Sequence, residues 1–88
     1  MWKNQLSPLP TKLIVYVAFA RDEEGELRPA FEAREAQSES GAKQQARLLW
    51  ASGKYEGVIA WSREADLING EFGEPVTLFS EGEIPEIE

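Results

Sequence analysis

The chain has 88 residues, of which 42% are hydrophobic and 10% aromatic, and this composition is typical of one small folded domain over residues 1–88. It contains no Cys and no His, which excludes disulfides, thiolate nucleophiles, imidazole bases and metal sites built on those ligands. The formal net charge of −7 disfavours direct binding to nucleic acid or to anionic lipid.

The beginning of the chain, MWKNQLSPLP, lacks the apolar run of a signal peptide. No stretch approaches the roughly 20 apolar residues that a membrane span requires. We therefore expect a cytoplasmic protein without membrane association. Residues 1–11 are expected to form an irregular N-terminal arm, and residues 81–88 an acidic tail that frays or lies along the edge of a sheet.

The first half of the chain predicts a β-hairpin. The segment 12–20, KLIVYVAFA, is rich in β-branched and aromatic residues, as strands are. A polar turn at 21–26 follows, and the segment 27–35 then alternates apolar with polar residues. The two segments should pair as antiparallel strands.

A helix is expected after the hairpin. Ser38 or Ser40 can cap its N-terminus, and it should run to about Ser52, where Gly53 supplies the left-handed residue that ends many helices. Four residues of this segment share one side of the helix and should face the sheet: Ala42, Ala46, Leu49 and Trp50.

Two further strands are expected at 55–62 and 75–80, joined by a longer connection at 63–74. The right-handed crossover through the helix favours the strand order 2-1-3-4, which leaves Pro29 and Pro75 in edge strands. The predicted fold class is α+β, with the element order ββαββ and a four-stranded antiparallel sheet that carries one helix on one face.

Both faces of the predicted sheet are apolar. Six residues are expected to face the helix: Leu13, Val15, Val17, Phe19, Ile59 and Trp61. Five residues are expected to point away from it: Ile14, Tyr16, Ala18, Val58 and Ala60. A sheet face in water normally alternates apolar with polar residues, so something should cover this second face.

Three covers for the second face are open. One is the N-terminal arm, through Trp2, Leu6 and Leu9, and another is the C-terminal pair Ile84 and Ile87. The third is a second molecule, and we expect a homodimer, because isologous association is the commonest way for a small domain to bury such a patch.

The segments VAFARD (17–22) and IAWSRE (59–64) match in residue type. The domain is therefore either two similar hairpins related by a pseudo-twofold axis or a case of chance similarity between two strand ends. In the predicted strand order, Arg21 and Arg63 lie at opposite ends of the sheet and do not converge on one pocket.

No residue of this chain is assigned a catalytic, cofactor-binding or metal-ligating role. The acidic segment RDEEGE (21–26) is either a weak cation site or a solvated turn, and it lacks the ligand spacing of an EF-hand. Ser62 has neither a nucleophile elbow nor an imidazole partner. Phe72 lies between two glycines and is either an exposed contact or a plug over the core.

A surface for protein contacts is expected on the second face of the sheet, at the end of the third strand and in the loop that follows. Its candidate residues are Ile14, Tyr16, Val58, Trp61, Arg63 and Phe72.

The segments 13–35 and 57–86 resemble small hypothetical proteins of proteobacteria and their phages. This resemblance implies a bacterial or prophage setting and a compact α+β domain. It implies no function and no catalytic residue.

The leading functional hypothesis is a noncatalytic module for protein–protein interaction or regulation, active as a homodimer or with an unidentified protein partner. The alternative is an acidic decoy of nucleic acid, as some phage proteins are, since acids cluster at 22–26 and 81–88. The third hypothesis is a small enzyme that depends on carboxylates or a metal, which the missing His and Cys disfavour.

Overall fold

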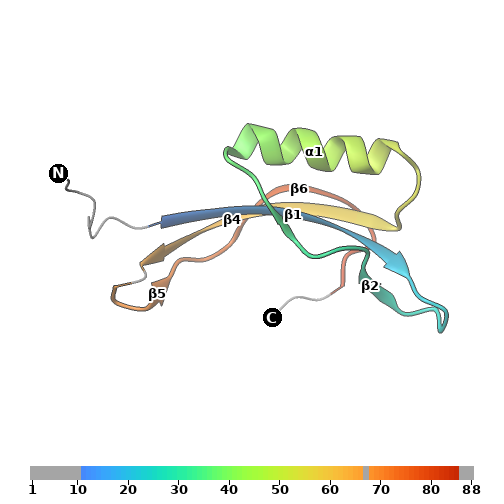
Figure 1. Cartoon of the computed structure of the whole chain (residues 1–88), viewed down its shortest axis with the longest axis horizontal. Coiled ribbons are helices and arrows are strands. Elements are labelled where there is room, and N and C mark those ends of the chain that lie inside the picture. Colours follow the sequence, from blue (N-terminus) through green and yellow to red (C-terminus); the bar gives the residue numbers. More distant parts are fainter. Residues whose placement is uncertain (1–10, 67, 86–88) are drawn as a thin grey trace.

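The computed structural model describes residues 11–66 and 68–85, which form one helix packed on one side of an antiparallel sheet (Figure 1). The predicted α+β class is therefore confirmed. The elements in chain order are β1 (Thr11–Arg21), β2 (Leu27–Pro29), β3 (Arg34–Glu35), α1 (Glu39–Ala51), β4 (Gly57–Asp66), β5 (Glu71–Phe72) and β6 (Val76–Gly82). Of the expected arm at residues 1–11, residues 1–10 lie outside the described residues, and Thr11 begins β1 instead.

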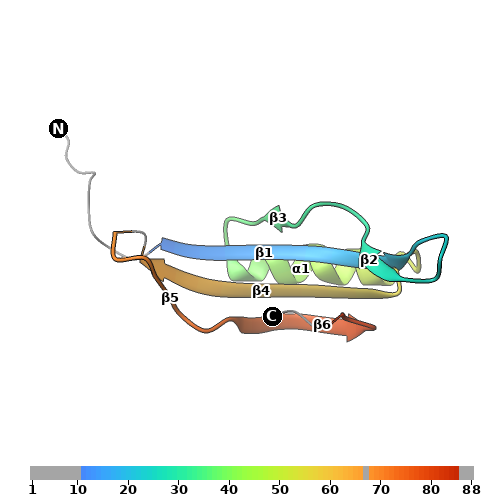
Figure 2. The ribbon, with the colours of Figure 1, turned by 90° about the horizontal axis from the view of Figure 1, so that it is seen from below.

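The long strands β1 and β4 pair antiparallel at the centre of the sheet, with Val17 opposite Ile59. On the outer side of β1 lie β2 and β3, and on the outer side of β4 lie β5 and β6 (Figure 2). The described residues thus form six strands where we predicted four.

The second predicted strand divides into β2 and β3 because the chain leaves the sheet between them. Phe31 is half-buried there, and its ring meets the ring of Tyr55 edge to face at a centroid distance of 6.2 Å. The guanidinium carbon of Arg34 lies 4.1 Å from the centroid of the Phe31 ring. Packing of this aromatic side chain therefore overrides the alternating pattern that predicted one continuous strand.

The helix begins and ends where its caps predict. The Ser38 side chain accepts a hydrogen bond from the Gly41 backbone N–H at 2.9 Å, which satisfies one of the unpaired N–H groups of the first turn. Gly53 has a φ of 74°, which suits the left-handed position after a helix. No helix in the described residues has the length and apolar character needed to cross a membrane.

The core lies on the face of the sheet opposite to the one we predicted. Two small residues of α1, Ala42 and Ala46, are completely buried against the sheet. Their partners are the residues expected to point away from the helix: Ile14, Tyr16, Ala18, Val58 and Ala60. The expectation was wrong because both faces are apolar, so alternation shows which residues share a face and not which face the helix covers.

The chain crosses to the other face of the sheet at its C-terminal end. After β6 it turns below the sheet, on the side away from α1 (Figure 1). We call residues 83–85 the strap. The Glu83 N–H donates to the Glu56 carbonyl at 2.8 Å, and Ile84 and Pro85 are half-buried. Ile87 lies outside the described residues.

Two glycines make this crossing sterically feasible. Gly82 has a φ of 78°, and a Cβ there would lie 2.7 Å from the Trp50 ring. A Cβ on Gly57 would lie only 1.9 Å from the Glu83 carbonyl oxygen, so the strap backbone rests directly on Gly57. We call the side of the sheet away from α1 the helix-free face. Since Gly57 is opposite Phe19, the strap covers the end of this face where Phe19 lies.

Candidate functional site

Three of the six predicted surface residues belong to the core instead. Ile14 is 9% exposed, Tyr16 8% and Val58 0%, because α1 packs on their face of the sheet. These three residues therefore contribute to no surface in the described structure, and this part of the prediction was wrong.

The other three predicted residues lie together on the helix-free face. Trp61 is opposite Val15, and Arg63 is opposite Leu13, so their side chains share the face that α1 leaves uncovered. Phe72 in β5 pairs with Ala65, two positions beyond Arg63 on the same face. The Phe72 side chain is 55% exposed, which is inconsistent with a plug over the core and leaves its ring accessible for contact.

The Arg63 side chain is held by contacts with Phe72 and Gly73. Its Nε donates to the Gly73 carbonyl oxygen at 2.8 Å, and its guanidinium carbon lies 5.4 Å from the centroid of the Phe72 ring. The Gly73 N–H in turn donates to the Glu64 carbonyl at 2.7 Å, which fixes the loop against β4. Among the described residues, no carboxylate lies within 4.0 Å of the Arg63 guanidinium.

These residues define an apolar surface with one cationic group, which we call the open patch: Leu13, Val15, Ile59, Trp61, Arg63 and Phe72. All of them are half-buried except Phe72. A sheet face that remains in water normally carries polar residues at these positions. Exposed apolar residues that are contiguous and flanked by polar groups are typical of protein interaction surfaces.

The opposite end of the same face is arranged like the open patch but is covered. Counted from the central pair of Val17 and Ile59, Phe19 and Trp61 are each two residues further along their own strand, and Arg21 and Arg63 are each four residues further. The two arginines are therefore at opposite ends of one face, as we expected. Whether the two hairpins are a true repeat stays a hypothesis.

At the Phe19 end, the helix-free face already binds a segment of its own chain, the strap. Val17 is 6% exposed and Phe19 4%, although both lie on the side away from α1. The Arg21 guanidinium forms an ion pair with the Glu83 carboxylate of the strap. An extended acidic and apolar segment therefore already occupies the end of the face where Arg21 lies.

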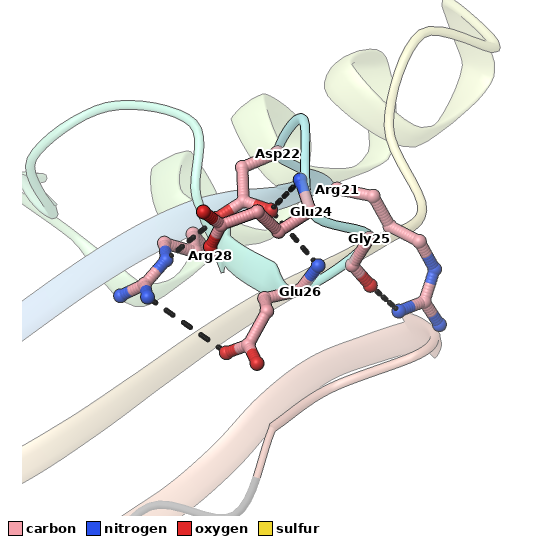
Figure 3. Close-up of polar contacts among 6 residues, drawn as sticks. All are labelled: Arg21, Asp22, Glu24, Gly25, Glu26 and Arg28. Carbon is pink, nitrogen blue, oxygen red and sulfur yellow. Dashed lines mark hydrogen bonds and ion pairs between the residues drawn. The ribbon is translucent and has the colours of Figure 1, made fainter.

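The acidic turn at 22–26 is organised by its own hydrogen bonds (Figure 3). Asp22 Oδ1 accepts the N–H groups of Glu24 and Glu26, both at 2.9 Å, and its Oδ2 accepts from Arg28 Nε at 2.9 Å. The Glu26 N–H bond and then the Arg28 guanidinium hold the pKa of the Asp22 carboxyl below its usual range. Both carboxylate oxygens are thus engaged, which favours the solvated turn over a cation site.

This turn predicts a pH dependence of stability. Because the pKa of Asp22 is lower in the folded chain than in the unfolded chain, its ionised form stabilises the fold above about pH 4, and that contribution is lost as the pH falls through the lowered value. Asp22→Asn should therefore flatten the loss of stability on acidification, measured by urea unfolding at neutral and acidic pH. Glu23→Gln, which removes one carboxylate from the same turn, is the control. Equal pH dependence in Asp22→Asn and wild type would contradict this role.

A polar hollow of about 250 Å³ lies at the N-terminal end of α1, lined in part by Lys12, Glu39 and Ser62. Lys12 Nζ lies 2.7 Å from Glu39 Oε2, and this hydrogen bond raises the pKa of Lys12 and lowers that of Glu39. Ser62 is 2% exposed and lines the same hollow as Lys12 and Glu39. A lysine with a raised pKa stays protonated and is a poor base for activating a serine.

Sequence reasoning missed Gly57 and Glu83, which position the strap. Their close contact joins segments far apart in the chain, and no periodic pattern reports such a contact. The only local signal was the pair of glycines at 57 and 82, which the register places opposite one another.

Within residues 11–66 and 68–85, no group of three or more acidic residues is placed to hold a metal ion. Comparison of the chain with protein-family models, with curated proteins and with solved structures finds no match, so the open patch and the strap are interpreted from their own geometry.

Proposed function

We propose that this protein is a noncatalytic protein–protein interaction module and that it forms a homodimer through its helix-free face. The observation that carries the proposal is the open patch, in which Trp61, Val15 and Leu13 of the central strands are incompletely covered, with polar residues on the neighbouring strands β3 and β6. A second copy is the commonest partner for such a surface on a small domain. A cytoplasmic setting in a bacterium or prophage is part of the same proposal.

The other exposed apolar side chains do not compete with the open patch. Leu48 and Trp50 of α1 are 57% and 36% exposed, Val76 of β6 is 57% exposed, and Ile68 in the loop between β4 and β5 is 68% exposed. Isolated apolar residues on a surface are normal and need no partner. The open patch differs because its members are neighbours on three paired strands, β1, β4 and β5.

The nucleic-acid decoy receives no support from the arrangement of the acids. The turn at 22–26 lies at one end of the sheet together with Glu81 and Glu83, where Arg21 pairs with Glu83, whereas Glu64, Asp66 and Glu71 lie at the other end. A mimic of a phosphate backbone needs its charges on one continuous surface. These two groups of acids lie at opposite ends of the sheet instead.

Substitution of Val15 tests the homodimer. Val15 is half-buried at the middle of the helix-free face, so Val15→Glu would place a charge without a partner inside the interface. Burial of such a charge costs about 3 kcal/mol or more, which corresponds to a loss of affinity of about 100-fold. We expect sedimentation velocity to show a dimer for the wild type and a monomer for Val15→Glu.

Gln45→Glu on the exposed side of α1 is the matched control, because it adds the same charge away from the proposed interface. It should remain dimeric. Circular dichroism of both variants verifies that they are folded. A wild-type chain that sediments as a monomer at all concentrations up to the millimolar range would refute the homodimer.

A further inference from the structure

The two ends of the helix-free face carry matching cationic groups, but only one of them has a carboxylate partner in the described residues. Arg21 pairs with Glu83 of the strap. Arg63 is fixed by the Gly73 carbonyl and the Phe72 ring, and no described carboxylate lies within 4.0 Å of it. In a chain of net charge −7, an arginine placed in this way on an apolar surface is complementary to an acidic segment.

We infer that the acidic C-terminal segment of a second copy occupies the open patch and that its carboxylates pair with Arg63. This inference rests on the proposed homodimer and specifies how the two copies are joined. The strap of each copy remains on its own Phe19 end, and the residues that follow it, Glu86, Ile87 and Glu88, reach the open patch of the partner.

The symmetry of a dimer brings these groups together. A twofold axis that lies in the interface, perpendicular to the strands, turns one copy end for end. The strap end of each copy then lies over the open patch of the other, because the strap and Arg63 are at opposite ends of one face. Each dimer contains this contact twice, and in both the Arg63 of one copy meets the acidic segment of the other.

The shape of the sheet supports the same arrangement. Both ends of the sheet bend away from α1, so the helix-free face is the inner side of the bend (Figure 1). Two such faces cannot touch along their whole length without something between them. The strap already fills this space at one end of each copy, where its backbone rests on Gly57 opposite the buried Phe19. The acidic segment of the partner would fill it at the other end.

A charge-swap experiment tests the inference. Arg63→Glu, and separately the double variant Glu86→Lys with Glu88→Lys, should each raise the dimer dissociation constant at least about tenfold, measured by sedimentation velocity. An equimolar mixture of the two variants should restore the dimer, because both contacts then join opposite charges. Arg47→Glu on the exposed side of α1 is the control for charge reversal and should leave the dissociation constant unchanged.

The outcomes separate this inference from the proposed function. A wild-type dimer that persists in Arg63→Glu, with no gain on mixing, would overturn the pairing of Arg63 while leaving the homodimer intact. A monomeric wild type would overturn both. Restored dimerisation in the mixture alone would establish that the acidic segment of one copy contacts Arg63 of the other.

Discussion

Gly57→Ala should destabilise the protein by about 1–3 kcal/mol, because the new methyl group has no space beneath the strap. Its Cβ would lie 1.9 Å from the Glu83 carbonyl oxygen and 2.6 Å from the Glu83 carbonyl carbon. All three nearest atoms belong to the Glu83 backbone, so the strap must move if the strand is to stay in register. Urea unfolding monitored by tryptophan fluorescence measures the loss.

A chain without residues 83–88 provides the decisive comparison. Removing the strap removes the clash, so Gly57→Ala should change the free energy of unfolding by less than about 0.5 kcal/mol in the shortened chain. The difference between the two backgrounds is the coupling between Gly57 and the strap. Equal destabilisation in both backgrounds would show that the strap does not rest on Gly57.

Ala60→Leu should also destabilise the protein by about 1–3 kcal/mol, through overpacking of the core. Ala60 is completely buried in the same cluster as Ala46 of α1, between Tyr16 and Phe79 on the neighbouring strands. Only small residues separate the sheet from α1 here, so a leucine would force the helix away from it. Urea unfolding would show this as a lower midpoint.

Ser80→Leu is the matched control for Ala60→Leu. Ser80 is opposite Ile59 on the other face, and it is exposed in the edge strand β6. The same bulk should be tolerated there within about 0.5 kcal/mol. The opposite result, with tolerance at position 60 and loss at position 80, would mean that the helix covers the face that we first predicted.

The helix and the central strands were predictable from the sequence because their signals are local. Ser38 and Gly53 define the ends of α1, and the β-branched runs define β1 and β4. Which face of the sheet the helix covers was not predictable. Both faces of β1 and β4 are apolar, and only the fit between Ala46 of α1 and the small residues of the sheet decides between them.

The candidate site was predictable only in part, for the same reason. Trp61, Arg63 and Phe72 were found because aromatic and cationic residues stand where a strand ends. Leu13, Val15 and Trp61 were all assigned to the face that the helix was expected to cover, and only Trp61, near the strand end, was also named as a surface residue. The strap could not be predicted, since its contact with Gly57 depends on a crossing of distant segments.

The most direct test of the proposed interface is a nuclear Overhauser experiment that detects contacts only between an isotope-labelled copy and an unlabelled copy. We expect contacts between copies from the side chains of Leu13, Val15 and Ile59 on the helix-free face. Contacts that come instead from the exposed Leu48 of α1, or an absence of contacts between copies at millimolar concentration, would contradict it.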